Sequence, residues 1–138
     1  MPTSADVLLD TSAAVALVDG SHPAHRAARD ATRGLTRGLA GHALVETYSV
    51  LTRLPGDARL SPGLAAQVIA RAFPASVSLP TEDALNAVAT FADAGIAGAA
   101  VYDGLVALAA RAAGKPLLSC DRRAIPTYAA LQVDARLI

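Results

Sequence analysis

Three aspartates stand where a folded chain could bring their carboxylates together. Asp10 follows the apolar run 7–9, and Asp121 comes soon after the apolar pair 117–118; both runs predict short buried strands. Asp103 lies near the start of an Ala- and Leu-rich segment that predicts a helix. In open α/β sheets, ligands bind in the crevice beyond the carboxyl ends of the strands. We therefore expect these three carboxylates at one edge of a sheet.

The two predicted helices beside these acids have recognisable ends. Thr11 and Ser12 are both available to cap the first of them. Asp103 falls in the first turn of the second, where the positive end of the helix dipole favours a carboxylate. Gly114 ends that helix, and Pro116 prevents its continuation.

A fourth acid, Glu46, lies in the first two turns of a predicted helix over residues 42–54. On a helical projection it shares a face with Val50 and Leu54. The adjacent stripe is apolar and consists of Leu44, Tyr48 and Leu51. A carboxylate with such neighbours either points into a polar cleft or is an ordinary boundary residue, and the pattern leaves both interpretations open.

If these acids converge, their charges need compensation. Three or four neighbouring carboxylates cannot all stay ionised without a counter-charge, because each raises the pKa of the others. A hard divalent cation such as Mg²⁺ or Mn²⁺ suits an oxygen-rich site, whereas a zinc site would need nearby Cys or His ligands. Oxygen-ligated cations characteristically help to split phosphodiesters, since they polarise the phosphate and lower the pKa of an attacking water.

The histidines and the single cysteine favour no competing site. Cys120 alone can form neither an internal disulfide nor a thiolate zinc site. No histidine is placed in sequence context to activate its thiol as a nucleophile. We interpret the histidines as surface or capping residues, because an i,i+3 pair without a third ligand is a poor metal site; they are His22, His25 and His42.

Length and composition limit the possible classes of protein. The 138 residues suit one domain spanning residues 1–138. Twelve basic and twelve acidic side chains cancel, so the total charge predicts no broad polyanion-binding surface. A start without a signal-like pattern and the lack of a long apolar segment favour a cytoplasmic protein that makes no membrane contact.

A local basic stripe lies on the predicted helix over residues 25–33. Its arginines are spaced three and four residues apart, which places them on one helix face; they are Arg26, Arg29 and Arg33, with an extension to Arg37. A solvated helix face and a surface for RNA or a protein partner both account for this pattern.

Short apolar runs alternate with helical segments along the chain, which predicts a mostly parallel sheet with helices on both faces. The strands are predicted at residues 7–9, 39–40, 77–79, 117–118 and within 133–138. The remaining helices are predicted at residues 12–18, at 61–73 and from residue 81 onward. The fold class is therefore α/β.

Four segments together resemble the PIN domain family, and specifically the VapC toxins of bacterial type II toxin–antitoxin pairs. They are Val7–Ala14 (VLLDTSAA), Glu46 on its helix, Val101–Leu105 (VYDGL) and Leu118–Asp121 (LSCD). Each segment alone is weak, but their order and spacing agree with the family over nearly the whole chain. The resemblance implies a three-layer α/β/α PIN-like domain.

The resemblance also implies an endoribonuclease toxin that depends on Mg²⁺ or Mn²⁺ and is neutralised by a cognate antitoxin. Ser12 and Ser119 match positions where the family has a small hydroxyl residue that bonds the acids or a metal-bound water. Cys120 departs from the family, which more often has a basic or polar residue there, and this departure concerns local substrate contacts. The implied catalytic and metal-binding residues are the four acids Asp10, Glu46, Asp103 and Asp121.

Three kinds of partner are expected. Arg122 and Arg123 are placed to contact RNA phosphates that flank the scissile bond. Little charge between residues 44 and 54 suggests apolar surface that a C2 homodimer would cover. The resemblance adds an antitoxin whose basic side chain would enter the acidic site.

Two other classes of function stay open. A phosphoryl-accepting receiver domain also gathers acids at the carboxyl edge of a parallel sheet, but it needs a lysine at the end of a late strand, and Lys115 precedes its strand. A non-catalytic PIN-like binding module is the third interpretation. It would be favoured if the four acids could be removed without consequence.

Overall fold

The computed structural model describes residues 4–138 and contains a four-stranded sheet in which all paired strands are parallel. In spatial order the strands are β2 (Arg37–Leu39), β1 (Val7–Leu9), β3 (Leu117–Ser119) and β4 (Ala135–Leu137). Leu9 pairs with Leu39 on one side and with Leu118 on the other. The strands that precede Asp10 and Asp121 are therefore neighbours at the centre of the sheet.

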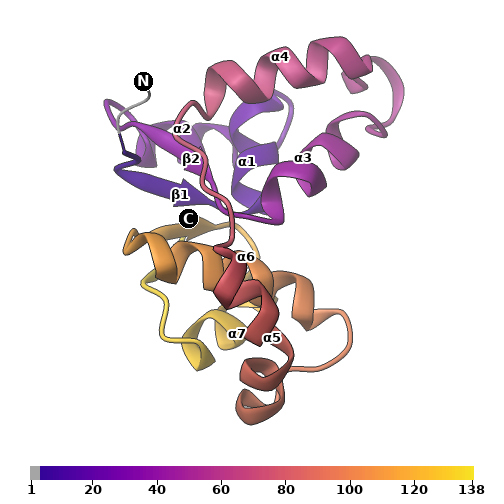
Figure 1. The fold of residues 1–138 in the computed structure, drawn as a ribbon. Helices are drawn as coiled ribbons and strands as arrows, with labels where there is room; N and C mark the ends of the chain where they lie inside the picture. Colours follow the sequence, from indigo (N-terminus) through magenta and orange to yellow (C-terminus); the bar gives the residue numbers. More distant parts are fainter. Residues whose placement is uncertain (1–3) are drawn as a thin grey trace.

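Helices cover both faces of this sheet, as Figure 1 shows. One layer holds α1 (Thr11–Val18), α2 (His25–Ala31), α3 (Ala43–Leu51) and α4 (Pro62–Ala72). The other holds α5 (Thr81–Ala94), α6 (Ala100–Ala113) and α7 (Ile125–Ala130). Short 3-10 turns lie at Gly56–Ala58 and Arg122–Ala124. The predicted three-layer α/β/α fold is confirmed.

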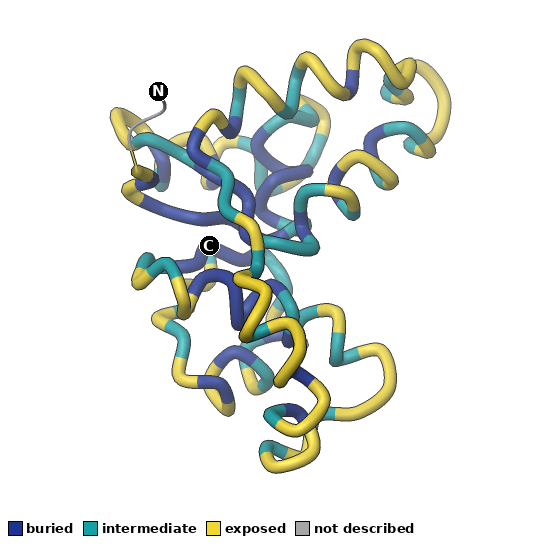
Figure 2. The backbone as a smooth tube through the Cα atoms, viewed as in Figure 1, coloured by how far each residue is buried: buried dark blue, intermediate teal, exposed yellow. Residues whose placement is uncertain are grey.

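The core lies where both helix layers meet the sheet. Every residue of β1 and β3 is buried, which explains why their sequences are apolar without alternation (Figure 2). The largest fully buried side chain is Tyr128, on α7. Because α1 packs against both central strands, the start of this helix is held firmly at the carboxyl end of β1.

The chain leaves the two central strands on opposite sides of the sheet. From β1 it passes through α1 and α2 to β2, and from β3 it passes through α7 to β4. The order therefore reverses between β1 and β3, and such a switch point leaves a crevice at the carboxyl ends of the strands. The fold places a crevice where the sequence places Asp10 and Asp121.

The predicted strand at residues 77–79 is wrong, because this segment makes only an isolated bridge between Ala40 and Val77. The N–H groups of Ala75 and Val77 do donate to carbonyls of β2. However, the Leu39 N–H donates to the Ser76 hydroxyl at 2.9 Å instead of to a backbone carbonyl. This side-chain acceptor interrupts the ladder.

Three other predictions need correction. Asp10, and neither Thr11 nor Ser12, caps α1: its carboxylate accepts from a backbone N–H of the first turn. Arg37 lies on β2 and donates to the Ala72 carbonyl at 3.3 Å, so it does not extend the basic stripe of α2. Helix α3 ends at residue 51, since the chain turns ahead of a proline.

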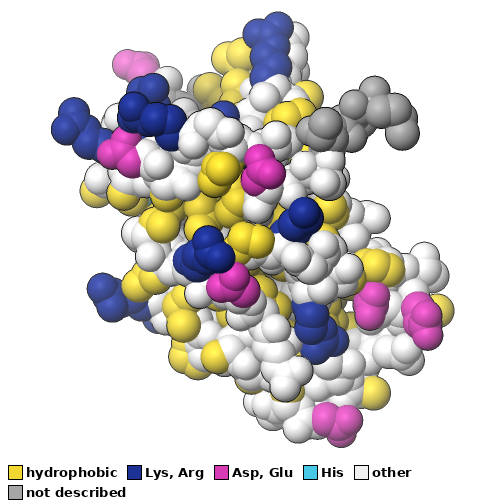
Figure 3. All heavy atoms as spheres, turned by 90° about the vertical axis from the view of Figure 1, so that its left-hand side faces the viewer, with side chains coloured by type: hydrophobic (Ala, Val, Ile, Leu, Met, Phe, Trp, Pro, Cys, Tyr) yellow, Lys and Arg dark blue, Asp and Glu magenta, His cyan; other side chains and the backbone are white. Residues whose placement is uncertain are grey.

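The charged side chains follow no broad pattern on the face drawn in Figure 3, where basic and acidic groups are interspersed. None of the helices formed by residues 4–138 is long and apolar enough to cross a membrane.

Candidate active site

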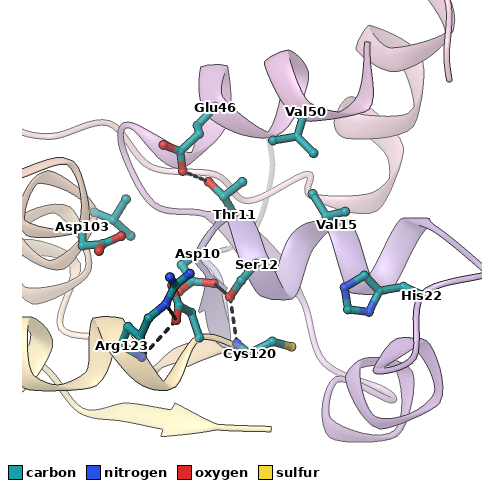
Figure 4. Close-up of a pocket in the computed structure, with 12 residues that line it drawn as sticks. Asp10, Thr11, Ser12, Val15, His22, Glu46, Val50, Asp103, Cys120 and Arg123 are labelled. Carbon is teal, nitrogen blue, oxygen red and sulfur yellow. Dashed lines mark hydrogen bonds and ion pairs between the residues drawn. The ribbon is translucent and has the colours of Figure 1, made fainter. Parts of the chain in front are cut away.

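A cavity of about 470 Å³ lies at the carboxyl ends of β1 and β3, at the switch point of the sheet. All four predicted acids line it, and each comes from a different part of the fold: Asp10 after β1, Glu46 on α3, Asp103 on α6 and Asp121 after β3. Figure 4 shows Asp10, Glu46 and Asp103 around the same space. Glu46 thus points into a polar cleft, which decides between its two interpretations.

Asp10 is buried and held by several hydrogen bonds. Only 4% of its surface is exposed. Its Oδ1 accepts from the Ser12 hydroxyl at 2.6 Å and from the Ala13 N–H at 3.0 Å. Its Oδ2 accepts from the Tyr128 hydroxyl at 2.7 Å, and its backbone N–H donates to the Leu118 carbonyl at 3.1 Å. The orientation of this carboxylate is therefore set before any ligand binds.

The role of Tyr128 could not be read from the sequence. Its ring is fully buried in the core, and its hydroxyl reaches Asp10 across 118 residues of chain. Burial and the nearby carboxylate of Asp10 raise the pKa of Tyr128, which keeps the hydroxyl protonated as a donor. No local pattern in the segment 125–130 predicts this contact.

Ser12 and Ser119 join the two central strand ends. Besides donating to Asp10, the Ser12 hydroxyl accepts from the Cys120 N–H at 2.8 Å. The Ser119 hydroxyl accepts from the Asp121 N–H at 3.0 Å and lies 3.4 Å from the Ser12 hydroxyl. Ser12 therefore bonds an acidic side chain directly, whereas Ser119 positions the backbone of the next acid.

Glu46 is held by a residue that the sequence analysis assigned only to helix capping. The Thr11 hydroxyl donates a short hydrogen bond to Glu46 Oε1. The second oxygen, Oε2, lies 3.8 Å from His42 Nε2. Because Thr11 adjoins Asp10, this contact links the α3 wall of the cavity to the end of β1.

Asp103 experiences a different environment from Asp10. It is half-buried on α6, and burial raises its pKa to about 6, with further contributions from the negative charges of Asp10, Asp121 and Glu46. The positive charge of Arg123 lowers the pKa of Asp103 and so partly offsets these effects. The carboxylate of Asp103 is thus the point at which the crowding of negative charge is most evident.

Gly104 lets α6 approach α5 closely beside this acid. A Cβ at position 104 would lie 2.6 Å from a ring carbon of Phe91. The Phe91 ring is buried against this point. The glycine therefore allows α6 to pack closely against Phe91 of α5 at the residue next to Asp103.

The remaining polar residues of the cavity have limited roles. Arg123 lines it, with its Nε 3.4 Å from Asp121 Oδ1, whereas Arg122 does not line it. Burial and Asp10 raise the pKa of Cys120, which disfavours the thiolate that a nucleophile would need. His22 accepts a turn hydrogen bond through Nδ1, as a capping residue does.

Among residues 4–138, no group of three His, Cys, Asp or Glu side chains is arranged to hold a metal ion on its own. The donors nevertheless fit Mg²⁺, which usually keeps several waters and binds one or two carboxylates together with substrate phosphates. Burial and, after it, the negative charges of Asp10, Asp121 and Glu46 raise the pKa of Asp103, so a cation beside this carboxylate would be favourable. The cavity therefore suits a partly hydrated hard cation.

Comparisons with known proteins agree with the four motifs. The model of the PIN domain family matches residues 7–130. The chain is 43% identical over 120 residues to Ribonuclease VapC27 of Mycobacterium tuberculosis, which covers 87% of this chain and 88% of that protein. It is 41% identical over 137 residues to Ribonuclease VapC40 of the same organism, covering 94% of this chain and 96% of that protein.

One solved structure has the same fold. The crystal structure of FitAcB from Neisseria gonorrhoeae superposes with a TM-score of 0.67 at 15% sequence identity, covering 94% of this chain and 95% of that chain. At this identity the likeness supports the fold alone.

Proposed function

Because this chain belongs to the PIN domain family, we propose that it is a VapC-type endoribonuclease toxin that acts with Mg²⁺ or Mn²⁺. One observation carries the proposal: four carboxylates from four separate parts of the fold line one cavity at the switch point of the sheet. The two relatives from Mycobacterium tuberculosis are named ribonucleases, which supports RNA as the substrate.

Asp10 and Asp103 would hold the cation. Glu46 would serve as a further ligand or orient a water, and Asp121 would act through a second, weaker ion. When bound, such a cation would polarise the scissile phosphate and lower the pKa of the attacking water. In the cleavage, the water oxygen bonds to phosphorus while the bond from phosphorus to the leaving ribose oxygen breaks.

The side chains of the protein prepare this step. Ser12 and Tyr128 fix both oxygens of Asp10, so the carboxylate does not have to reorganise. Thr11 holds Glu46 Oε1, and Oε2, which lies 3.8 Å from His42 Nε2, would bind the cation or orient the attacking water. Arg123, at the rim, is placed for a phosphate of the RNA backbone.

We also propose that a cognate antitoxin inhibits the enzyme by occupying the cavity. A basic side chain would compensate the same carboxylates that attract a cation. The resemblance to VapC toxins supports this partner. A purified complex with the antitoxin that cleaved RNA as fast as the free protein would contradict inhibition by occlusion.

A homodimer is proposed from exposed apolar side chains, of which the helix expected from the sequence, α3, presents Val45 at 65% exposure, and α5 presents two more. Leu85 and Val88, one helical turn apart, are each 80% exposed. A second copy of the chain is the commonest partner for such a face. Light scattering should give twice the chain mass, and a monomer at micromolar concentration would contradict the proposal.

Expression in a bacterial host, followed by mapping of new RNA 5′ ends, tests the proposed function. The wild-type chain should generate new ends that Asp10→Asn does not. Asp57→Asn is the matched control, because Asp57 is an exposed acid that does not line the cavity. Equal cleavage by wild type and Asp10→Asn would contradict the proposal.

A further inference from the structure

A second cavity lies on the far side of Glu46 from the acidic site. Its volume is about 460 Å³, within the range of small-ligand pockets. It is lined by His42, Val45, Glu46, Ser49, Arg53 and Tyr102, and we call it the Tyr102 pocket. Glu46 lines both cavities, and Tyr102 directly precedes Asp103 on α6. A polymer bound across the acidic site would therefore reach this pocket with an adjacent unit.

The pocket contains the aromatic ring of Tyr102, which stacks on a second ring. The rings of Tyr102 and His42 stack with their centroids 5.3 Å apart and their planes at 26°. Tyr102 is nevertheless 51% exposed, so a large part of its ring remains available. Because the two rings come from α6 and α3, the stack joins the two walls that carry Asp103 and Glu46.

A free cationic group completes the pocket. Arg53 is exposed in the turn after α3, and its Nε lies 3.4 Å from the Ser49 hydroxyl. Within residues 4–138, the ion pairs of the structure involve other arginines, so the guanidinium of Arg53 has no carboxylate partner there. An exposed ring beside an unpaired guanidinium is the combination that single-stranded nucleic acids meet in binding grooves.

We propose that the Tyr102 pocket binds a nucleobase of single-stranded RNA, namely the base of a nucleotide next to the one cleaved. The base stacks on Tyr102, and Arg53 pairs with a backbone phosphate. Bases of a duplex are already stacked on each other, so the pocket selects unpaired RNA. Every base has a π-face, so the stacking favours this location in the strand more than one base identity. This inference rests on the proposed ribonuclease function.

Binding of a fluorescein-labelled single-stranded RNA of mixed sequence tests the pocket. Anisotropy is measured with Mg²⁺ in an Asp103→Asn background, in which we expect no cleavage and verify this on a gel. Adding Tyr102→Ala should weaken binding by a factor between about five and a hundred, as the loss of one base–aromatic stack predicts. Tyr102→Phe keeps the ring and should bind as the background protein does. Circular dichroism verifies that each variant is folded.

Tyr48 supplies the matched control. This partly exposed tyrosine lies on α3, the helix that contributes Val45 and Ser49 to the pocket, yet Tyr48 does not line the pocket. Tyr48→Ala should leave RNA affinity unchanged. Replacing single nucleotides of the RNA by abasic residues should identify one position whose loss weakens binding to the background protein and has no effect once Tyr102 is alanine.

Three results would overturn the inference. One is a folded Tyr102→Ala protein that binds the RNA with unchanged affinity. Another is an equal loss of affinity in Tyr102→Ala and Tyr48→Ala. The third is a change in oligomeric mass on Tyr102→Ala with RNA affinity unchanged, which would assign the pocket to a protein interface. Wild-type protein that bound RNA through Tyr102 but cleaved none would contradict the proposed function and leave the pocket assignment standing.

Discussion

Two walls of the acidic cavity, one at the end of β1 with Asp10 and one on α6 with Asp103, surround their carboxylates differently. On the β1 wall, Asp10 is more deeply buried, yet Ser12, Ala13 and Tyr128 donate hydrogen bonds to its oxygens. On the α6 wall, Asp103 is less buried, and desolvation and neighbouring negative charge dominate its environment. Burial alone therefore does not decide whether a carboxylate is strained; the donors around it do.

This difference suggests that Asp10 and Asp103 contribute to cation binding in different ways. A carboxylate that accepts hydrogen bonds from the fold gives a fixed ligand, while one that is partly desolvated and repelled by its neighbours gains most when a cation binds. Asp10 would thus set the position of the cation and Asp103 would supply much of the attraction for it.

An alanine substitution should lower stability at Asp10 and should not lower it at Asp103. Asp10→Ala removes the cap of α1 and leaves the Tyr128 hydroxyl buried without an acceptor, so the free energy of unfolding should fall by about 2–4 kcal/mol. Asp103→Ala removes a repelled carboxylate and should not lower it in metal-free buffer. Urea denaturation measures both, and a larger loss at Asp103 would reverse the comparison.

Tyr128→Phe removes one hydrogen bond to Asp10 without replacing any acidic residue. Asp10 Oδ2 would stay buried with its donor removed, so we expect a loss of about 1–3 kcal/mol in the free energy of unfolding. RNA cleavage should also fall, because the carboxylate is no longer held. A variant as stable and as active as wild type would show that this hydrogen bond does not position Asp10.

Magnesium should stabilise the protein chiefly through the α6 wall. Binding to the folded state alone stabilises it by mass action, by about 1.4 kcal/mol at ten times the dissociation constant. The melting temperature of wild type should rise with millimolar Mg²⁺, and the rise should shrink in Asp103→Asn. A wild-type melting temperature that does not change with Mg²⁺ or Mn²⁺ would count against an assembled cation site.

The pH dependence of stability should also identify Asp103. Its pKa is raised from 3.8 to about 6 in the folded state, so the folded protein binds this proton more tightly than the unfolded chain does. Protonated Asp103 therefore adds to the free energy of unfolding. This contribution is fully present below about pH 3.8 and is lost as pH rises through about 6. Solvent screens this half-exposed group, so the loss should be on the order of 1 kcal/mol.

The comparison that measures this loss is between wild type and Asp103→Asn in metal-free buffer. The stability advantage of the asparagine variant should grow between about pH 4.5 and about pH 8. An advantage that did not change over this range would show that Asp103 titrates normally.

Local sequence patterns predicted the parts of this molecule that depend on local structure. The apolar runs before Asp10 and Asp121 are strands, and Gly114 adopts the left-handed conformation that ends α6, with φ of 65°. Parallel strands share one carboxyl edge, so the convergence of Asp10 with Asp121 followed from the strands alone.

Contacts between distant segments could not be predicted in the same way. The hydroxyl of Tyr128 meets Asp10 across 118 residues, and that of Thr11 meets Glu46 across 35. No periodicity or spacing in the sequence predicts either contact, because both depend on how the layers of the fold pack together. The interrupted ladder at residues 75–77 is similar, because a single serine hydroxyl decides it.

The most direct test of the acidic site is the rate of RNA cleavage by matched asparagine variants. Asparagine keeps the shape of aspartate and removes its charge, so Asp10→Asn and Asp103→Asn should fold as wild type does by circular dichroism. With Mg²⁺ or Mn²⁺ present, wild type and Asp57→Asn should cleave RNA, whereas Asp10→Asn and Asp103→Asn should not. Folded Asp10→Asn and Asp103→Asn proteins that cleave at the wild-type rate would contradict the acidic-site mechanism and favour a non-catalytic binding module.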